Sequence, residues 1–423
     1  MLITVYNLLK LSGFSSKIAE MILPLIDNLR MSYQITCFNM LGMAYDDLGQ
    51  YQEALDCHLS ALPLTRLDDN LPAEVAHLSG IGLQYSNLGE YEQALDHYEQ
   101  ALDLSRDTDN RKQERSILNN MAVVFNSLGQ KLEALSIYED SLAIARDIDD
   151  KQGVAVTLAN IGDAYGAIGD VDKTIECYQE AIDLYASIGD KIGRGITIGK
   201  MGNAAAMLGS YDDALKLLDV AVDIAEHADN RLWEVLHKAD IAAVHTHSDS
   251  IEKGLGLLED LLPHAKDVGT PIVMNYVYNL LAGAFLYLGQ FEEAFSASKR
   301  AIQYTIPSNQ HYQYALSGLI LVKLENTQAA QHAFTMSLDH AAELLDNTPN
   351  LYSPKYSRGL ALMGLALVTN DMSYADDAKV AYLQARENCD AKGVVRREMK
   401  NLNMLTWEDG EDNSSFMDKF QDE

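Results

Sequence analysis

The sequence contains few prolines and an unusually small share of basic residues. Its 8 prolines in 423 residues argue against long disordered linkers. Lysine and arginine number 32 against 62 aspartates and glutamates, so the formal net charge is −30. Such a surface repels phosphate backbones and anionic membranes, so we expect neither nucleic acid nor a membrane as partner. A partner of basic character remains compatible with this charge.

Cysteines are also scarce, and export signals are missing. None of Cys37, Cys57, Cys177 and Cys389 lies in a CxxC pair or a zinc-binding spacing. The apolar N-terminus lacks a basic region before its hydrophobic run, and no segment reaches the roughly 18 apolar residues that a membrane span needs. We therefore expect reduced thiols and a cytoplasmic location.

The motifs of common catalytic sites are missing too. The sequence has no GxxxxGK[ST], GxGxxG, GxSxG or HExxH pattern. The nearest approach to a metal cluster is His237, Asp240, His245 and His247, of which only His237 and Asp240 share a helix face. We predict no enzyme, no cofactor and no metal site. A metal-dependent enzyme built on these histidines is the remote alternative.

What the sequence does contain is a repeat of 40 residues. One marker is glycine at 49, 89, 129, 169, 209 and 289, a series that only Asp249 interrupts. A second marker keeps the same step half a period later, at 69–70, 109–110, 149–150, 189–190, 229–230 and 269–270. Two markers in each period indicate a unit of two helices repeated head to tail.

The residues inside each unit predict how its helices begin, end and pack. Asn70, Asn110, Asp150, Asp190, Asn230 and Thr270 are expected N-caps, and each ladder glycine is expected to end a first helix in a left-handed conformation. Small residues such as Gly82 recur in the first helix, and we expect the aromatic residue three positions later, here Tyr85, to fill the space beside them.

The order of small, aromatic, glycine and alanine residues resembles the tetratricopeptide repeat. LGMAYDDLGQYQEALDCHLSAL and IGLQYSNLGEYEQALDHYEQAL carry this signature. The 40-residue step resembles the long-repeat branch seen in Pins/LGN-type scaffolds, kinesin light chain and bacterial signalling proteins. The resemblance implies an all-α, right-handed superhelical solenoid of about nine antiparallel helix pairs.

The repeat also suggests domain boundaries. Residues 1–34 are interpreted as a degenerate N-terminal repeat or cap, and 35–306 as seven regular units. Residues 307–406 are interpreted as degenerate C-terminal pairs with a capping helix, since terminal repeats lack a neighbour on one side. The acidic segment 407–423 is predicted to be a disordered tail.

Polar residues on the inner side of the first helices are the best candidates for a binding site. In the superhelix that the resemblance implies, these positions line the concave surface: Asn39, Asn119, Asn120, Asn160, Asp163, Lys200, Asn203, Asp240 and Asn279. Asparagine is a poor helix former, and its amide can hold the backbone of a bound peptide. The alternative is that these amides bond one another between neighbouring repeats.

We therefore predict a protein-interaction scaffold that binds a peptide or helical segment of a partner in the concave groove. The alternative is a regulatory sensor subunit whose superhelix responds to a signalling peptide. Lys200 is nearly alone as an inner cation, so a ligand of the kind held by the family's carboxylate clamp is not expected.

Overall fold

The computed structural model of the chain describes residues 26, 29–47, 50–248, 250–304 and 306–405. Most of the predicted N-terminal cap, the ladder position Gly49 and the acidic tail 407–423 lie outside these residues. Within them the structure contains α-helices and one short 3-10 helix, without any strand.

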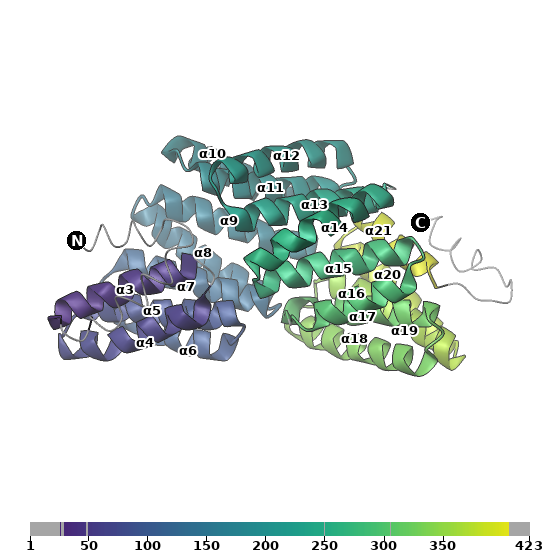
Figure 1. The fold of residues 1–423 in the computed structure, drawn as a ribbon, viewed down its shortest axis with the longest axis horizontal. Helices are drawn as coiled ribbons and strands as arrows, with labels where there is room; N and C mark the ends of the chain where they lie inside the picture. Colours follow the sequence, from purple (N-terminus) through teal and green to yellow (C-terminus); the bar gives the residue numbers. More distant parts are fainter. Residues whose placement is uncertain (1–25, 27–28, 48–49, 249, 305, 406–423) are drawn as a thin grey trace. The chain divides into compact units, whose positions relative to one another are not determined.

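The helices follow one another in pairs (Figure 1). They are α3 (Met31–Asp47), α4 (Tyr51–Leu67), α5 (Leu71–Leu88), α6 (Tyr91–Asp107), α7 (Arg111–Ser127), α8 (Lys131–Asp147), α9 (Lys151–Ile168), α10 (Val171–Ile188), α11 (Lys191–Met207), α12 (Tyr211–His227), α13 (Arg231–His247), α14 (Ile251–Val268), α15 (Pro271–Tyr287), α16 (Phe291–Ile302), η1 (Pro307–Asn309), α17 (Gln310–Lys323), α18 (Thr327–Asn347), α19 (Tyr352–Thr369), α20 (Ser373–Asn388) and α21 (Lys392–Asn403).

The chain divides into two compact units, Met1–Asn160 and Ile161–Glu423. Inside each unit, the two helices of a pair pack against each other, and each pair packs against the next. The arrangement confirms the predicted all-α solenoid of helix pairs.

The predicted helix caps are confirmed at each described marker. The side chain at each predicted N-cap accepts a hydrogen bond from the backbone N–H three residues later, as from Gln113 to Asn110 at 3.2 Å. Gly89, with a φ of +82°, is one of the ladder glycines that adopt the left-handed conformation. The other turn has an aspartate in that conformation at four positions, for example Asp109 at a φ of +52°, and a glycine at Gly189 and Gly269. Aspartate tolerates this region better than most residues.

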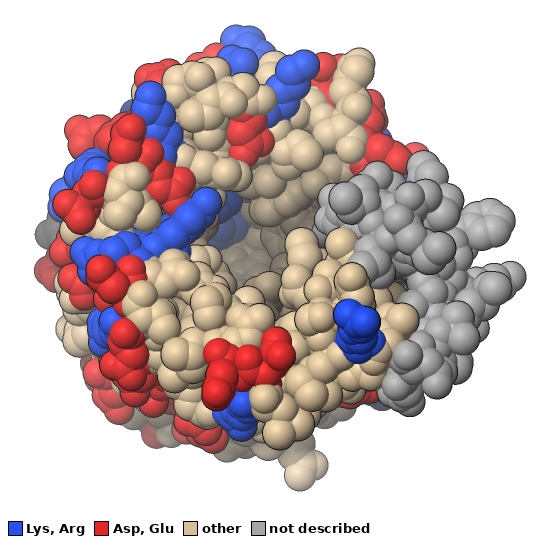
Figure 2. Space-filling view, turned by 90° about the vertical axis from the view of Figure 1, so that its left-hand side faces the viewer, with Lys and Arg blue, Asp and Glu red and all other residues tan. Residues whose placement is uncertain are grey.

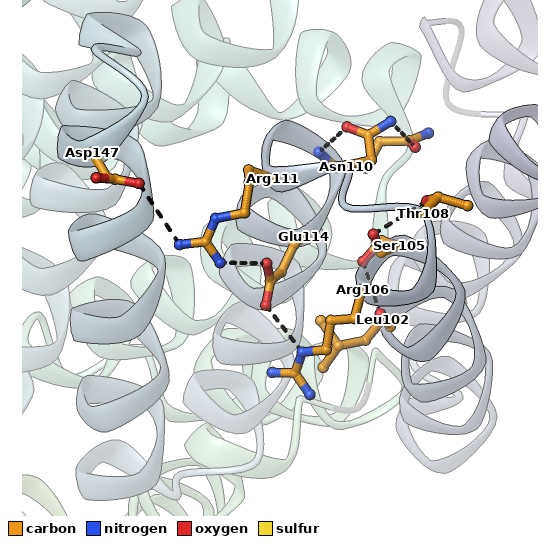
Figure 3. Close-up of polar contacts among 9 residues, drawn as sticks. Leu102, Ser105, Arg106, Thr108, Asn110, Arg111, Glu114 and Asp147 are labelled. Carbon is orange, nitrogen blue, oxygen red and sulfur yellow. Dashed lines mark hydrogen bonds and ion pairs between the residues drawn. The ribbon is translucent and has the colours of Figure 1, made fainter.

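Ion pairs add to the turn between α6 and α7 (Figure 3). The Arg106 guanidinium lies 3.0 Å from a Glu114 carboxylate oxygen, and Arg111 contacts the other oxygen at 2.8 Å. One repeat earlier, Arg66 and Glu74 form the same pair at 2.7 Å. The contact therefore recurs with the 40-residue step.

The packing inside a repeat differs from the sequence expectation in one respect. A Cβ on Gly82 would lie 2.8 Å from the ring of Tyr98, which belongs to the second helix of the pair. Gly162 meets Tyr178 in the same way, at 2.6 Å. The expectation that Tyr85 fills this space is wrong, because a side chain on the same helix points past the small residue while the facing helix reaches it.

Acidic side chains are spread over the face displayed in Figure 2, with Lys and Arg side chains among them. Across the described residues, no helix combines the length and apolarity that crossing a membrane requires.

Candidate functional site

The first helices of successive pairs form a continuous layer in the second unit. α11 packs against α13, α13 against α15, α15 against α17, and α17 against α19. We call these five helices the inner layer. The helix α21 does not continue the series of pairs, because it packs against α11, α13 and α19. It therefore lies against the inner layer.

In the first unit, two of the four predicted inner asparagines bond to each other. Asn160 donates from Nδ2 to Oδ1 of Asn119 at 3.2 Å, and Thr157 donates to the same oxygen at 3.4 Å. Asn119 is buried. Asn39 contacts the Met43 sulfur of its own helix at 4.0 Å, and Asn120 is half-buried. The Asn119–Asn160 bond joins neighbouring repeats. For these two residues the structure thus agrees with the alternative to ligand binding, in which inner amides bond one another between repeats.

Asp163 and Lys200 form a pair of their own between α9 and α11. The Lys200 Nζ lies 2.5 Å from Oδ2 of Asp163, and the Tyr178 hydroxyl donates to Oδ1 at 2.6 Å. Burial, reinforced by the Asp163 charge, raises the pKa of Tyr178, so the phenol stays protonated. Both sides of the ion pair keep some exposure, so it is weakly stabilising and accessible to a ligand.

Asn203 and Asp240 both line a cavity of about 270 Å³ between the inner layer and α21. Asn203 is exposed, whereas Asp240 is buried and accepts a hydrogen bond from the Tyr276 hydroxyl at 2.7 Å. The Tyr211 hydroxyl is buried and has no hydrogen-bond partner among the described residues. Tyr211 also lines the cavity. The walls thus offer an amide, a carboxylate and an unused hydroxyl.

Asn279 has a structural role in the same layer. It is buried and donates to Oδ1 of Asn275 at 2.9 Å. Asn275 in turn donates to the carbonyl oxygens of Ala301 and Tyr304, at 3.3 and 2.5 Å. Asn279 therefore orients an amide that holds the end of α16, since a buried amide needs its hydrogen bonds satisfied.

Sequence reasoning missed a group of tyrosines in the inner layer. We call Tyr276, Tyr287, Tyr312 and Tyr352 the tyrosine cluster; burial raises the pKa of each of them, to about 12 for Tyr312 and Tyr352. The positive charge of Arg397 on α21 acts against this increase in pKa at all four tyrosines. Its guanidinium is therefore close enough to interact electrostatically with each of the four hydroxyls.

Arg397 is held by its neighbour in sequence. Its Nε and Nη2 both donate to Oε1 of Glu398, at 2.8 and 2.6 Å. Burial alone would lower the pKa of Arg397, but the Glu398 carboxylate and the nearby phenols more than offset it, so the guanidinium stays charged. One sequence signal for this site was present: the segment KGVVRREMKNLN is basic within a strongly acidic chain.

Two of the histidines singled out in the sequence, His237 and His247, have different surroundings. The His237 ring stacks on Trp233, with centroids 5.5 Å apart, and its Nδ1 lies 3.6 Å from Asp240. His247 lines the cavity, where burial and the charges of Arg397 and Lys400 lower its pKa to about 3. Among the described residues, no three His, Cys, Asp or Glu side chains lie close enough to hold a metal ion.

Family models match part of the chain. The family model described as Tetratricopeptide repeat matches residues 73–147 and 153–227, and a second model of that description matches 35–66. The comparison with curated protein sequences gives no match.

Several solved structures share the fold. A Rap protein complexed with Competence and Sporulation Factor is 12% identical, with a TM-score of 0.58, covering 82% of this chain and 98% of its own. The Rap conjugation gene regulator of plasmid pLS20, in complex with the Phr* peptide, is 15% identical with a TM-score of 0.51, covering 64% and 76%. The quorum sensor NprR from B. thuringiensis, in its apo form, is 16% identical with a TM-score of 0.50, covering 80% and 97%.

Proposed function

We propose that this chain, which carries tetratricopeptide repeats, is an interaction scaffold that binds a peptide segment of a partner protein at its inner layer. The role proposed is binding without catalysis, in the cytoplasm. A partner of basic character suits the net charge of −30.

The observation that carries this proposal is the cavity at Asn203 and Asp240. Its volume of about 270 Å³ far exceeds the roughly 10–15 Å³ that one water molecule requires. Because its walls are both apolar and polar, a peptide side chain can fill it while the backbone bonds to Asn203. Two solved structures of the same fold, the Rap protein and the pLS20 regulator, are complexes with a factor and a peptide.

Selection from a displayed peptide library tests the proposal. We expect the enriched peptides to bind the wild-type chain at least tenfold more tightly than an Asn203→Trp variant, because the indole occupies the mouth of the cavity. Asp219→Trp, at an exposed position of α12, is the matched control and should bind like the wild type. Equal binding by the Asn203→Trp and Asp219→Trp proteins would exclude the cavity as the binding site.

A peptide-responsive sensor is the second candidate, and the similarity to the quorum sensor NprR favours it. Small-angle scattering with and without an enriched peptide separates the two. A sensor changes its radius of gyration on binding, whereas a passive scaffold keeps it.

A further inference from the structure

The position of α21 is unlike that of the other helices. Instead of continuing the series of pairs, it packs against α11 and α13, more than 140 residues earlier in the chain. The approach depends on glycine: a Cβ on Gly393 would lie 2.0 Å from the carbonyl oxygen of Ala206 and 2.8 Å from that of Met207. The backbone of α21 therefore touches the end of α11 directly.

One face of α21 carries its basic side chains onto aromatic rings of the chain. The Lys400 ammonium lies 4.4 Å from the centre of the Tyr287 ring and donates to the Thr246 carbonyl at 3.3 Å. The Arg396 guanidinium lies 5.8 Å from the centre of the Tyr211 ring. Cations over aromatic faces are attracted by the ring quadrupole. Positions 393, 396, 397 and 400 fall on one side of a helix, so a single face makes these contacts.

The fit between α21 and the inner layer is incomplete. The cavity of about 270 Å³ lies between them, with Gly393, Val394 and Arg397 on one side and Tyr276 among the residues opposite. Protein cores are normally close-packed and satisfy their buried polar groups. Here space is left over and the Tyr211 hydroxyl has no partner among the described residues. A helix with a longer side chain or a hydrogen-bond acceptor at this place would fit better than α21 does.

We propose that the inner layer of the second unit is a receptor for a basic amphipathic helix of a partner protein, whose arginine enters the tyrosine cluster, and that α21 occupies this receptor until the partner helix displaces it. The proposal rests on the proposed function, since it requires a partner, and it specifies that partner's chemistry. Charge complementarity supports it: Lys392–Asn403 carries four Lys and Arg residues against one Glu, in a chain with a net charge of −30.

Binding of the helix in trans tests the proposal. The probe is a fluorescein-labelled peptide of residues 390–405, followed by anisotropy. The proteins are the full chain, a chain ending at residue 390, and a full-length Gly393→Val variant in which the valine collides with the Ala206 carbonyl and dislodges α21. Gly256→Ala is the matched control, because a Cβ there meets nothing within 4 Å.

We expect the shortened chain and the Gly393→Val protein to bind the peptide at least tenfold more tightly than the wild-type and Gly256→Ala proteins. An Arg397→Ala peptide should bind at least tenfold more weakly than the native peptide. Failure of both opened proteins to bind, or equal binding of the two peptides, would overturn the proposal. Loss of helical circular dichroism in both opened proteins would also overturn it, since α21 would then be a structural part of the fold.

This experiment and the library selection test different claims, so either can fail without the other. Because the probe is the chain's own segment, a positive result needs no external partner. Suppose that the α21 peptide binds in trans, but that the selected peptides bind equally well with and without Asn203→Trp, in both the wild-type and the Gly393→Val protein. The assignment of the cavity as the peptide site is then wrong, whereas the receptor for a basic helix is supported. If the selected peptides depend on Asn203 but the α21 peptide does not bind, only the receptor for a basic helix falls.

Discussion

A buried histidine pair makes the stability of the first unit sensitive to pH. Nδ1 of His58 on α4 lies 3.1 Å from Nδ1 of His77 on α5, and both rings are buried. The His58 ring fills the space beside Gly42 and Gly80, where added Cβ atoms would meet it at 2.9 and 2.7 Å. One nitrogen must donate and the other accept, so protonating either ring places two donors face to face.

The sign and size of the effect follow from the pKa values. Burial lowers the pKa of both His58 and His77 from 6.5 to about 4, with the charge of His58 adding to the effect at His77. The unfolded chain therefore binds more protons between these values. The contribution to stability is fully present above pH 6.5 and is lost as the pH falls toward 4. At pH 5 the loss is about 2 kcal/mol for each ring, and about 4 kcal/mol for the pair at most.

The variant that removes this effect follows from the repeat itself. One period later, the positions equivalent to 58 and 77 hold Tyr98 and Ile117, both buried. A His58→Tyr/His77→Ile protein therefore carries residues that the next repeat already has at these places. Amide hydrogen exchange in α4 and α5, corrected for intrinsic rates, gives the opening free energy at pH 7 and pH 5. We expect the wild type to lose about 2–4 kcal/mol between them and the variant less than about 1. Equal losses of opening free energy in the wild type and the variant would refute the argument. The loss would then come from groups that both proteins share, such as their carboxylates.

Three further predictions concern stability and are checked by urea unfolding followed by circular dichroism. Gly82→Ala should cost about 1–3 kcal/mol through overpacking, whereas Gly256→Ala, with open space beside it, should be neutral or stabilising; equal effects would contradict the packing argument. Asn110→Ala should cost about 0.5–2 kcal/mol and Asn110→Gly only a few tenths, because glycine tolerates the cap position; a loss of equal size would count against the cap. Lys200→Met should cost less than about 1 kcal/mol and lose that effect in 1 M salt, since its bond to Asp163 is partly exposed; a salt-independent loss would indicate a packing role.

The parts of the fold that the sequence predicted are those set by local chemistry. Asn110 caps α7 because a side-chain oxygen three residues before a free N–H can accept its hydrogen bond whatever lies farther away. Gly89 takes a left-handed conformation for an equally local reason, the absence of a Cβ. Both kinds of residue recur with the 40-residue period, so each repeat supported the same prediction.

Contacts between helices were predicted less well. The partner of Gly82 is Tyr98 rather than Tyr85, because helix crossing geometry decides which side chain reaches a small residue. The place of α21 was not predictable from periodicity. Its contact from Lys400 to Thr246 joins positions 154 residues apart, and a hydrophobic pattern does not specify which distant helix it meets.

The enrichment of inner asparagines has at least two causes, and separating them sharpens the candidate site. Asn119 accepts from Asn160 of the next repeat, and Asn279 donates to Asn275 of its own helix, so a ligand would have to break those bonds. Asn203 is exposed beside a cavity and therefore keeps its hydrogen-bonding capacity for a ligand. Since removing the partner of a buried amide costs about 1–3 kcal/mol, alanine at 160 should lower stability while alanine at 203 should not. A loss of peptide binding on Asn203→Ala with unchanged unfolding would then report recognition alone.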